Sequence, residues 1–394
     1  MNGRSWGPPD GRDFTELLYL FPTTFAVEIT SGFLIIRVHT LPPKPWPLTI
    51  GGLPVRFTTG KFDICFDYGK CGKGPKALDD LDLQRVHEFS EDILRRVMVF
   101  FQDAKIKIRS IFWLGNFWQV TLIDPVDLKV LPWTIASQGI QYKFASEIAY
   151  PDPSALRNKV PQGVEFDNTL YASSPNALLR PGIMLGSSIV TVTEDGKTEE
   201  LFKTTTSGIL VANRRGDLFI TVATNGFEND GLVYHPNPRS GILIGKISHS
   251  LPGTDISFAK LNPGLRYINE NFGSTNNPLG ARANGITPGQ PPRLRQFDPC
   301  SMNNPFSGRC DGQVRALGIE IPEGGDTKYV EHVWCSFENG DEPIDGSCGS
   351  PIIHENGDLI GFFRYKMDAN YCYAVSAKTL KEHGYEVCGG ERTF

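Results

Sequence analysis

Apolar residues in the second half of the chain occur in short runs that are separated by turn-forming residues. This texture begins near residue 176 and is typical of an all-β sandwich or barrel. The predicted strands are Met184–Val192, Thr204–Val211, Leu218–Thr224, Gly241–Ile247, Ile256–Leu261, Gln313–Ile321, Tyr329–Phe337, Pro351–His354, Leu359–Tyr365 and Tyr371–Val375. A helical turn over Lys378–His383 is predicted to close the fold.

The first half of the chain has a different pattern. Two strands are predicted over Phe25–Thr30 and Phe33–Val38, and a hairpin over Lys105–Trp113 and Phe117–Ile123. Residues 81–104 predict an amphipathic helix, because their apolar side chains recur at helical spacing. These side chains are Val86, Phe89, Ile93, Val97 and Phe100.

These patterns predict a mainly β protein with an α+β domain in front. The N-terminal domain covers residues 1–150 and contains no catalytic spacing, and residues 151–175 form a connector. The β-rich part, 176–394, divides into one half at about 176–265 and another at about 277–390. Pro263–Pro292, which is rich in Asn, Gly and Pro, links the two halves.

Composition narrows the class of protein. The 394 residues are 40% hydrophobic and 21% charged, as in ordinary soluble domains. A net charge of −5 argues against a nucleic-acid partner, which usually requires a basic surface. The first residues lack the apolar core of a signal peptide, and no apolar run can span a membrane. We therefore expect a cytoplasmic protein with no membrane partner; the sequence does not indicate an oligomeric state.

Eight cysteines are present, and without a secretory signal we expect them to be reduced. Cys300 and Cys310 flank a loop and could form a disulfide only in an oxidising compartment. Cys65 and Cys71 lack the second pair of ligands that a zinc site needs. We predict no metal and no cofactor.

One cysteine has a chemically suggestive setting. Cys348 stands between Gly346 and Gly349 in the turn Asp-Gly-Ser-Cys-Gly-Ser-Pro, where small neighbours leave a thiol accessible. Gly346 permits a backbone conformation in which the N–H groups of Gly346 and Cys348 point together at a developing oxyanion. The alternative is a Gly/Ser-rich turn that holds a buried structural thiol.

This turn resembles the nucleophile turn Gly-Asp-Ser-Gly-Gly-Pro of chymotrypsin-like (PA clan) peptidases, with cysteine as nucleophile as in related viral enzymes. The resemblance implies a double β-barrel and the chain order His, Asp, nucleophile. Gly253–Leu261 is similar to the family strand Asp-Ile-Ala-Leu-Leu-Lys-Leu, so Asp255 would orient the base. The strand that precedes the family's histidine is similar to Leu218–Phe227, and Asn225 stands at the histidine position.

An amide side chain cannot accept a proton near neutral pH, so Asn225 cannot act as a general base. The chain is then a pseudoenzyme, an inactivated variant, or an enzyme that uses another histidine. His235 and His249, both expected in loops near this position, are the candidates for such a replacement. His332, His354 and His383 have no suggestive context.

The resemblance also implies a peptide-binding region. Gly361–Lys366 is similar to the strand that pairs with a bound peptide, which makes Arg364 and Tyr365 substrate-binding candidates. Glu342 matches the base of the specificity pocket and would favour a basic substrate side chain. Ser347 replaces the aspartate that pairs with a freed N-terminus, so we expect no zymogen step. In length and pattern the chain resembles intracellular trypsin-like peptidase-domain proteins of fungi.

Three hypotheses follow. The chain is a trypsin-like cysteine endopeptidase homologue, impaired or inactive because Asn225 replaces the base. Alternatively, it is a non-catalytic pseudopeptidase whose partner is a bound peptide or protein. The third hypothesis is a structural β-sandwich in which Cys348 is a spectator. The first two require Asn225, Asp255 and Cys348 to lie within contact of one another.

Overall fold

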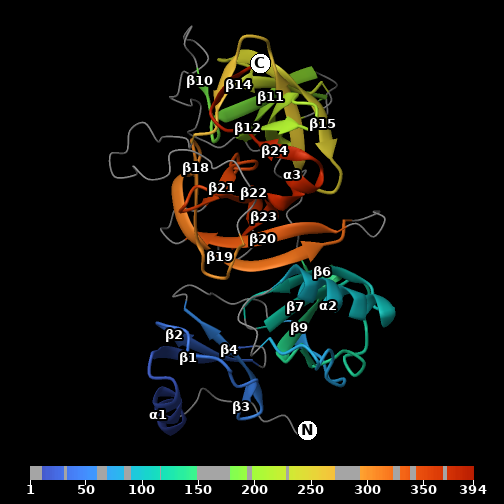
Figure 1. The fold of residues 1–394 in the computed structure, drawn as a ribbon, viewed down its shortest axis with the longest axis vertical. Helices are drawn as coiled ribbons and strands as arrows, with labels where there is room; N and C mark the ends of the chain where they lie inside the picture. The colour runs from blue at the N-terminus through green and yellow to red at the C-terminus, as the bar shows by residue number, and fades with distance from the viewer. Residues whose placement is uncertain are drawn as a thin grey trace. The chain divides into compact units, whose positions relative to one another are not determined.

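The computed structural model (Figure 1) divides the chain into two compact units. Unit 1 contains Met1–Ala149 with Gly318–Ile321, and unit 2 contains Tyr150–Leu317 with Pro322–Phe394. The residues that the structure describes are 11–30, 33–59, 69–83, 90–115, 117–148, 178–192, 198–227, 230–270, 293–322, 329–337, 343–366 and 371–394. The predicted connector, 151–175, lies outside these ranges.

Unit 1 begins with a helix and a small sheet. The helix α1 (Gly11–Leu20) precedes four strands in the order β1-β2-β4-β3. The strands are β1 (Thr24–Thr30), β2 (Phe33–Val38), β3 (Thr49–Ile50) and β4 (Leu53–Thr58). Leu17 of α1, Ile36 of β2 and Phe57 of β4 belong to one buried apolar cluster. The chain pattern had indicated β1 and β2, but not α1.

A second group of elements completes unit 1. It contains β5 (Lys70–Cys71), α2 (Glu91–Asp103), β6 (Ile108–Trp113), β7 (Phe117–Leu122), β8 (Thr134–Ile135), β9 (Gln138–Phe144) and a 3₁₀ turn, η1 (Ala145–Glu147). The segment Gly318–Ile321 joins this group, since the Ile321 N–H donates to the Arg109 carbonyl over 2.8 Å. Glu320 also forms an ion pair with Arg109.

The predicted helix over 81–104 starts too early. Residues 81–83 are not helical, and α2 begins at Glu91, directly after Ser90. Ser90 has an extended backbone, and its side chain accepts a hydrogen bond from the Ile93 N–H. A serine in this position caps a helix and fixes its first turn. The apolar spacing that extends to Val86 and Phe89 did not reveal this cap, and both residues lie outside the described ranges.

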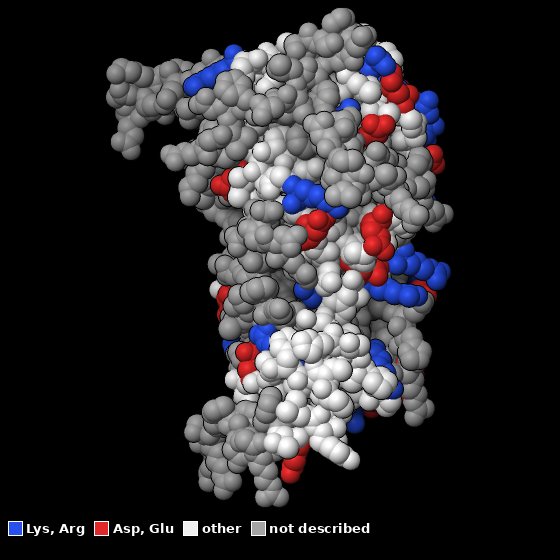
Figure 2. Space-filling model, turned by 90° about the vertical axis from the view of Figure 1, so that its left-hand side faces the viewer, with Lys and Arg blue, Asp and Glu red and all other residues white. Residues whose placement is uncertain are grey.

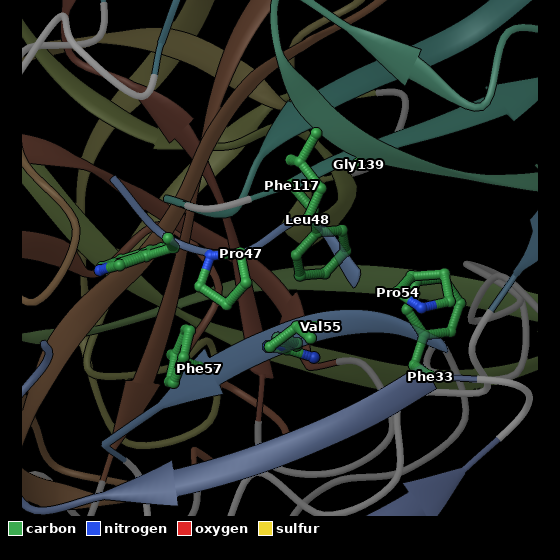
Figure 3. A pocket seen from close by; sticks show the side chains of 10 residues that line it. Phe33, Pro47, Leu48, Pro54, Val55, Phe57, Phe117 and Gly139 are labelled. Atoms are coloured by element: carbon green, nitrogen blue, oxygen red, sulfur yellow. The ribbon is translucent and has the colours of Figure 1, made fainter. Parts of the chain in front are cut away.

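Unit 1 has a small pocket between its two groups of elements (Figure 3). Trp46, Phe57 and Phe117 contribute rings to its wall, and the Arg56 guanidinium lies 4.8 Å from the Phe117 ring centre. The pocket volume is ≈ 20 Å³, which is room for about one water molecule. A peptide therefore does not fit here.

Unit 2 contains two closed six-stranded barrels (Figure 1). Barrel one has the order β11-β14-β15-β16-β13-β12, and β11 pairs with β12 to close it. Its strands are β11 (Met184–Val192), β12 (Thr198–Asn213), β13 (Leu218–Ala223), β14 (Leu232–His235), β15 (Ile242–Leu251) and β16 (Ile256–Leu261).

Barrel two repeats this plan with the order β18-β21-β22-β23-β20-β19, and β18 pairs with β19. Its strands are β18 (Pro299–Asn304), β19 (Gly308–Glu320), β20 (Val330–Phe337), β21 (Pro351–His354), β22 (Leu359–Lys366) and β23 (Tyr371–Ser376). The predicted mainly β fold with a double barrel is confirmed. Pattern alone missed β14 and β18, because neither shows clear apolar alternation.

The C-terminal segment returns to barrel one. After α3 (Lys378–Glu382), β24 (Tyr385–Val387) pairs with β12, so barrel two ends at β23 rather than near residue 390. The last strand, β25 (Glu391–Thr393), pairs with β17 (Arg266–Ile268), which in turn pairs with β10 (Leu178–Leu179).

Alternation along the strands fills three apolar clusters in unit 2. One contains Leu210 and Ile220 of barrel one, and another contains Val314 and Ile360 of barrel two. The third includes residues from both barrels, among them Phe258 of β16 and the β22 side chain Phe362. This shared cluster packs the barrels together and so fixes the loops at their junction.

Charged side chains of both signs are interspersed on the face shown in Figure 2. No helix among the described residues is long and apolar enough to cross a membrane.

Candidate functional site

Cys348 lies in the turn between β20 and β21, in a backbone shape that needs glycine. Gly346 has φ +100° and Gly349 has φ +87°, a region that side chains with a Cβ rarely adopt. A Cβ on Gly346 would lie 2.6 Å from the Phe306 ring. Both glycines that flank the thiol in the sequence therefore have a steric role.

Two threonines of β12 hold this turn. The Thr205 hydroxyl donates to the Cys348 carbonyl over 2.7 Å, and the Thr206 hydroxyl donates to the Gly346 carbonyl over 2.8 Å. The Thr206 N–H also donates to the Cys348 carbonyl over 3.1 Å. Barrel one thus fixes the turn of barrel two that carries the thiol. In the sequence these threonines appear only as a run of hydroxyl residues in the predicted strand Thr204–Val211. Strand propensity explains such a run, so the run does not indicate a contact with the Cys348 turn.

A second contact fixes the turn from within barrel two. Ser347 is fully buried, and its hydroxyl lies 2.7 Å from the hydroxyl of Ser307. Asn304 donates from its side-chain amide to the Ser350 hydroxyl over 3.0 Å. Ser347 therefore has a structural role at the position where the resembled family carries an aspartate.

Asp255 precedes β16 and lies beside the end of β13. The ladder between these strands pairs Ala223 with Ile256, so the next residues on each side meet at the barrel end. The Thr224 N–H donates to the Asp255 carbonyl over 3.0 Å, and the Asn225 N–H donates to Asp255 Oδ1 over 2.9 Å. The 3₁₀ turn η3 (Thr224–Gly226) presents these N–H groups.

The Asn225 side chain lies near the Cys348 thiol, and hydrogen bonding from it lowers the pKa of that thiol. The thiol itself donates to the Arg364 carbonyl, with 2.9 Å between Sγ and the oxygen. The structure therefore brings together all three residues that the sequence predicted for this site. A spectator thiol would not require that convergence.

The surroundings of the Cys348 thiol oppose its ionisation. Burial raises its pKa to about 12, and the negative charges of Asp255 and Asp345 act in the same direction. The hydrogen bond from Asn225 lowers the pKa, but does not offset these effects. Near neutral pH the sulfur is a neutral thiol, which is a poor nucleophile.

The Asp255 carboxyl is also perturbed. Burial raises its pKa to about 6, although the Arg364 charge and the N–H groups of Asn225 and Thr224 favour the carboxylate. Its Oδ2 atom is buried and has no hydrogen-bond partner among the described residues. An imidazole at position 225 would supply a donor on this side of the carboxyl, whereas Asn225 bonds to Cys348 instead.

Arg364 contributes to the site through its backbone and its charge. Its carbonyl accepts the thiol proton, and its charge lowers the pKa of both Asp255 and His332. The next residue, Tyr365, stacks on Tyr373 with ring centres 4.9 Å apart and planes 7° apart. Of the two predicted substrate-binding residues of β22, Arg364 contacts the thiol through its carbonyl, and Tyr365 follows it in the strand. Glu342, the third, lies outside the described residues.

Two backbone N–H groups of the turn are available to a ligand. Ser347 and Gly349 donate to the carbonyls of Ile344 and Phe363. Within the described residues, the Gly346 N–H has no acceptor, and the Cys348 N–H contacts only its own sulfur. These are the two groups that the sequence predicted for an oxyanion hole.

The histidines considered as replacement bases bond elsewhere. His235 is in β14 rather than in a loop, is 1% exposed, and its Nδ1 lies 2.7 Å from the Met184 carbonyl. His249 is in β15 and pairs through Nε2 with the Tyr385 hydroxyl. The prediction that these two residues lie in loops was wrong, because both belong to barrel strands.

The other histidines also have structural contacts. His332 is buried in β20, its Nδ1 lies 3.2 Å from the Ala374 carbonyl, and its ring lies 4.5 Å from that of Tyr373. His354 accepts from the Asn356 N–H over 3.3 Å. His383 follows α3 and lies 2.8 Å from the Thr379 carbonyl.

The described cysteines form no disulfide. Cys300 and Cys310 lie in paired strands but are each opposite another residue, Gly312 and Met302. Among the described residues, no three His, Cys, Asp or Glu side chains are grouped as metal ligands.

The two closed barrels, with the thiol turn at their junction, give unit 2 the chymotrypsin-like fold. The chain matches no family model and no curated protein. Among solved structures it is similar to a protease from Nocardiopsis, with 13% identity, coverage of 54% of this chain and 99% of that one, and a TM-score of 0.38. It is also similar to Cellulomonas bogoriensis chymotrypsin, with 14% identity, coverage of 54% and 98%, and a TM-score of 0.36. A third is a glutamic acid-specific serine protease, with 12% identity, coverage of 53% and 100%, and a TM-score of 0.34.

Proposed function

We propose that unit 2 carries a peptidase-type site of the cysteine class, and that this chain binds peptides there without hydrolysing them at an appreciable rate. Cys348 holds the nucleophile position, Asp255 the orienting position and Asn225 the position of the base. The site is thus a trypsin-like cysteine endopeptidase site that lacks its proton acceptor.

One observation carries the proposal: the residue whose backbone N–H donates to Asp255 and whose side chain lies near the thiol is an asparagine, where catalysis needs a base. A peptidase thiol must lose its proton to attack a carbonyl, and the proton needs an acceptor with a suitable pKa. An amide provides none. The Cys348 pKa of about 12 leaves very little thiolate near neutral pH.

Peptide binding is supported by groups that remain in place without the base. The N–H groups of Gly346 and Cys348 have no acceptor among the described residues other than the Cys348 sulfur. The half-buried ring of Tyr365 in β22 stacks on the ring of Tyr373 and offers a flat apolar surface. Such groups orient an extended chain whether or not it is cleaved.

The pH dependence of alkylation tests this proposal. The full chain is treated with iodoacetamide over a range of pH, and modification of Cys348 is followed by peptide mass spectrometry. We expect a rate that keeps rising to the alkaline end of the range, because only the thiolate reacts. A plateau that begins below about pH 7 would identify an activated thiolate and overturn the proposal.

Cys71 is the matched reference in the same experiment. It is also half-buried, and burial raises its pKa too. An activated Cys348 would react much faster than Cys71 near neutral pH, whereas under the proposal Cys348 should react no faster than Cys71.

A further inference from the structure

Two cysteines stand directly opposite each other in the wall of barrel two. Strands β20 and β23 pair antiparallel, and their ladder places Cys335 opposite Cys372 (Figure 1). Residues opposed in this way have their side chains on the same face of the sheet. Both cysteines belong to the buried apolar cluster of barrel two, both are 0% exposed, and both are free thiols. The two thiols therefore point together into the interior of the barrel.

The ladder sets a backbone separation that a disulfide can span. Directly opposed residues of an antiparallel pair have Cα atoms about 4.5–5.5 Å apart. Disulfides join cysteines whose Cα atoms are about 4.4–6.8 Å apart. A bond between Cys335 and Cys372 therefore requires rotation of the two side chains and no shift of the strands.

Cys300 is an alternative partner for Cys335. Hydrogen bonding with Cys335, together with burial, raises the pKa of the Cys300 thiol, which leaves less thiolate for exchange. Cys300 is in β18, and this strand pairs with β19 and β21. The ladder that holds Cys372 opposite Cys335 therefore has no counterpart for Cys300.

We propose that Cys335 and Cys372 are a disulfide-forming pair, which is oxidised when the chain folds in the presence of a small-molecule disulfide such as oxidised glutathione. The Cys335 thiolate attacks one sulfur of the oxidant and releases one glutathione thiolate. The Cys372 thiolate then attacks the Cys335 sulfur of this mixed disulfide and releases the second. The two protein thiols lose two electrons and two protons, and one oxidised glutathione becomes two molecules of glutathione.

The bond closes a loop around the candidate site. Cys335 and Cys372 are 37 positions apart, and the segment between them carries Cys348, Arg364 and Tyr365. A crosslink over such a loop restricts the unfolded chain and raises the folding equilibrium constant, on the order of 10²–10³-fold. The disulfide thus holds the thiol turn and β22 against unfolding. This effect does not depend on whether the site binds a peptide.

Burial determines when the bond forms and breaks. Neither thiol is exposed in the folded chain, and thiol–disulfide exchange requires access of the attacking thiolate to a sulfur. The bond therefore forms during folding, before barrel two is closed. Once formed, it resists a reductant until the barrel opens.

Refolding in a glutathione buffer tests the proposal. The full chain is unfolded in urea, refolded with oxidised and reduced glutathione, and its remaining thiols are blocked with N-ethylmaleimide. Digestion without reduction uses trypsin together with a glutamate-specific protease, which separates Cys335 from Cys348. In mass spectrometry we expect the most abundant cross-linked pair to join Cys335 to Cys372. This pair should be two hydrogen atoms lighter than the two reduced peptides combined.

Pulsed alkylation of Cys348 along a urea series measures the effect on the site. In the oxidised chain Cys348 should become reactive at a higher urea concentration than in the reduced chain, as the larger folding equilibrium constant requires. Cys372→Ala should abolish both the crosslink and this shift. Cys310→Ala is the matched control and should retain both, because Cys310 is in the same cluster and is 1% exposed but stands opposite Met302.

The crosslink is measured in the parent chain, so the result does not depend on the folding of either variant. A dominant crosslink from Cys335 to Cys300 or Cys348 would overturn the assignment. Complete blocking of Cys335 and Cys372 by N-ethylmaleimide after oxidative refolding would overturn it as well. An equal urea shift in the parent and in Cys372→Ala would contradict the proposed stabilisation of the site.

Discussion

The Asn225 N–H donates to Asp255 Oδ1 over 2.9 Å, while Oδ2 of the same carboxyl is buried with no partner among the described residues. The backbone at position 225 thus holds the carboxyl, while the side chain of the same residue lowers the pKa of the Cys348 thiol by hydrogen bonding. The relationship between these two residues underlies the predictions for Asn225 and Asp255.

Asn225→His should increase alkylation of Cys348 near neutral pH and produce peptide hydrolysis. The imidazole can accept the thiol proton and donate to Asp255 Oδ2, and general-base assistance contributes about 10²–10⁴-fold. Initial rates with iodoacetamide and with a fluorogenic peptide pool measure the effect.

Asn225→Gln is the control for that substitution, because it changes the length of the side chain but supplies no base. It should leave both rates near those of the parent. If the histidine variant behaves like the glutamine variant, position 225 is not the site of a missing base.

Asp255→Asn should stabilise the protein at neutral pH. The folded-state pKa of about 6 lies above the usual aspartate value of 3.8, so the folded state binds the proton more tightly than the unfolded state. Stability is therefore lost as pH rises from the lower value through the higher one. Removing the charge should raise the free energy of unfolding by about 1–3 kcal/mol near pH 7.5.

Urea unfolding of parent and variant at several pH values measures this difference, which should shrink below about pH 4. The exposed Glu386 provides the control, since Glu386→Gln should change the free energy by less than about 0.5 kcal/mol. A difference for Asp255→Asn that does not change with pH would contradict the prediction.

His332 should make the protein sensitive to acid. Burial, together with the Arg364 charge, lowers its pKa to about 3 from the usual histidine value of 6.5, so it stays neutral in the fold while the unfolded chain binds a proton. The contribution of His332 to stability is present above its unfolded-state pKa. It is lost as the pH falls toward its folded-state pKa. His332→Phe should reduce the loss of unfolding free energy over that range.

The Asp255 carboxyl changes the free energy of unfolding in the opposite direction over much of the same pH range. The effect of His332→Phe is therefore best measured in an Asp255→Asn background. His354→Phe, at a part-exposed position, is the matched control and should leave the pH profile unchanged. If both histidine variants give the same profile, His332 does not cause the acid sensitivity.

Thr206→Val should destabilise the thiol turn with little change in side-chain shape. It removes the donor to the Gly346 carbonyl, and a buried unsatisfied acceptor costs about 1–3 kcal/mol. Chemical denaturation measures this cost.

Thr204→Val is the matched control in the same strand. Its hydroxyl oxygen is buried without a hydrogen-bond partner among the described residues, so its loss should be neutral or slightly stabilising. Equal destabilisation by both variants would show that the strand, and not the bond to Gly346, determines the effect.

The amino-acid sequence determined the strands, the barrel class and the residue types of the site. Met184–Val192, Ile256–Leu261 and Pro351–His354 were predicted with the observed bounds, because each is a short, largely apolar run bounded by turn-forming residues. Asn225, Asp255 and Cys348 were predicted because the segments around them resemble peptidase motifs, and the structure places the three residues near one another.

Only the tertiary structure decided how those residues act. The pKa of Cys348 depends on burial and on charges from Asp255, which is 93 positions away in the chain, and no local pattern contains that information. The hydrogen bonds from Thr205 and Thr206 likewise exist only because β12 reaches the turn of the other barrel. His235 and His249 were misplaced for the same reason, since whether a short segment pairs as a strand depends on which neighbours the closed barrel supplies.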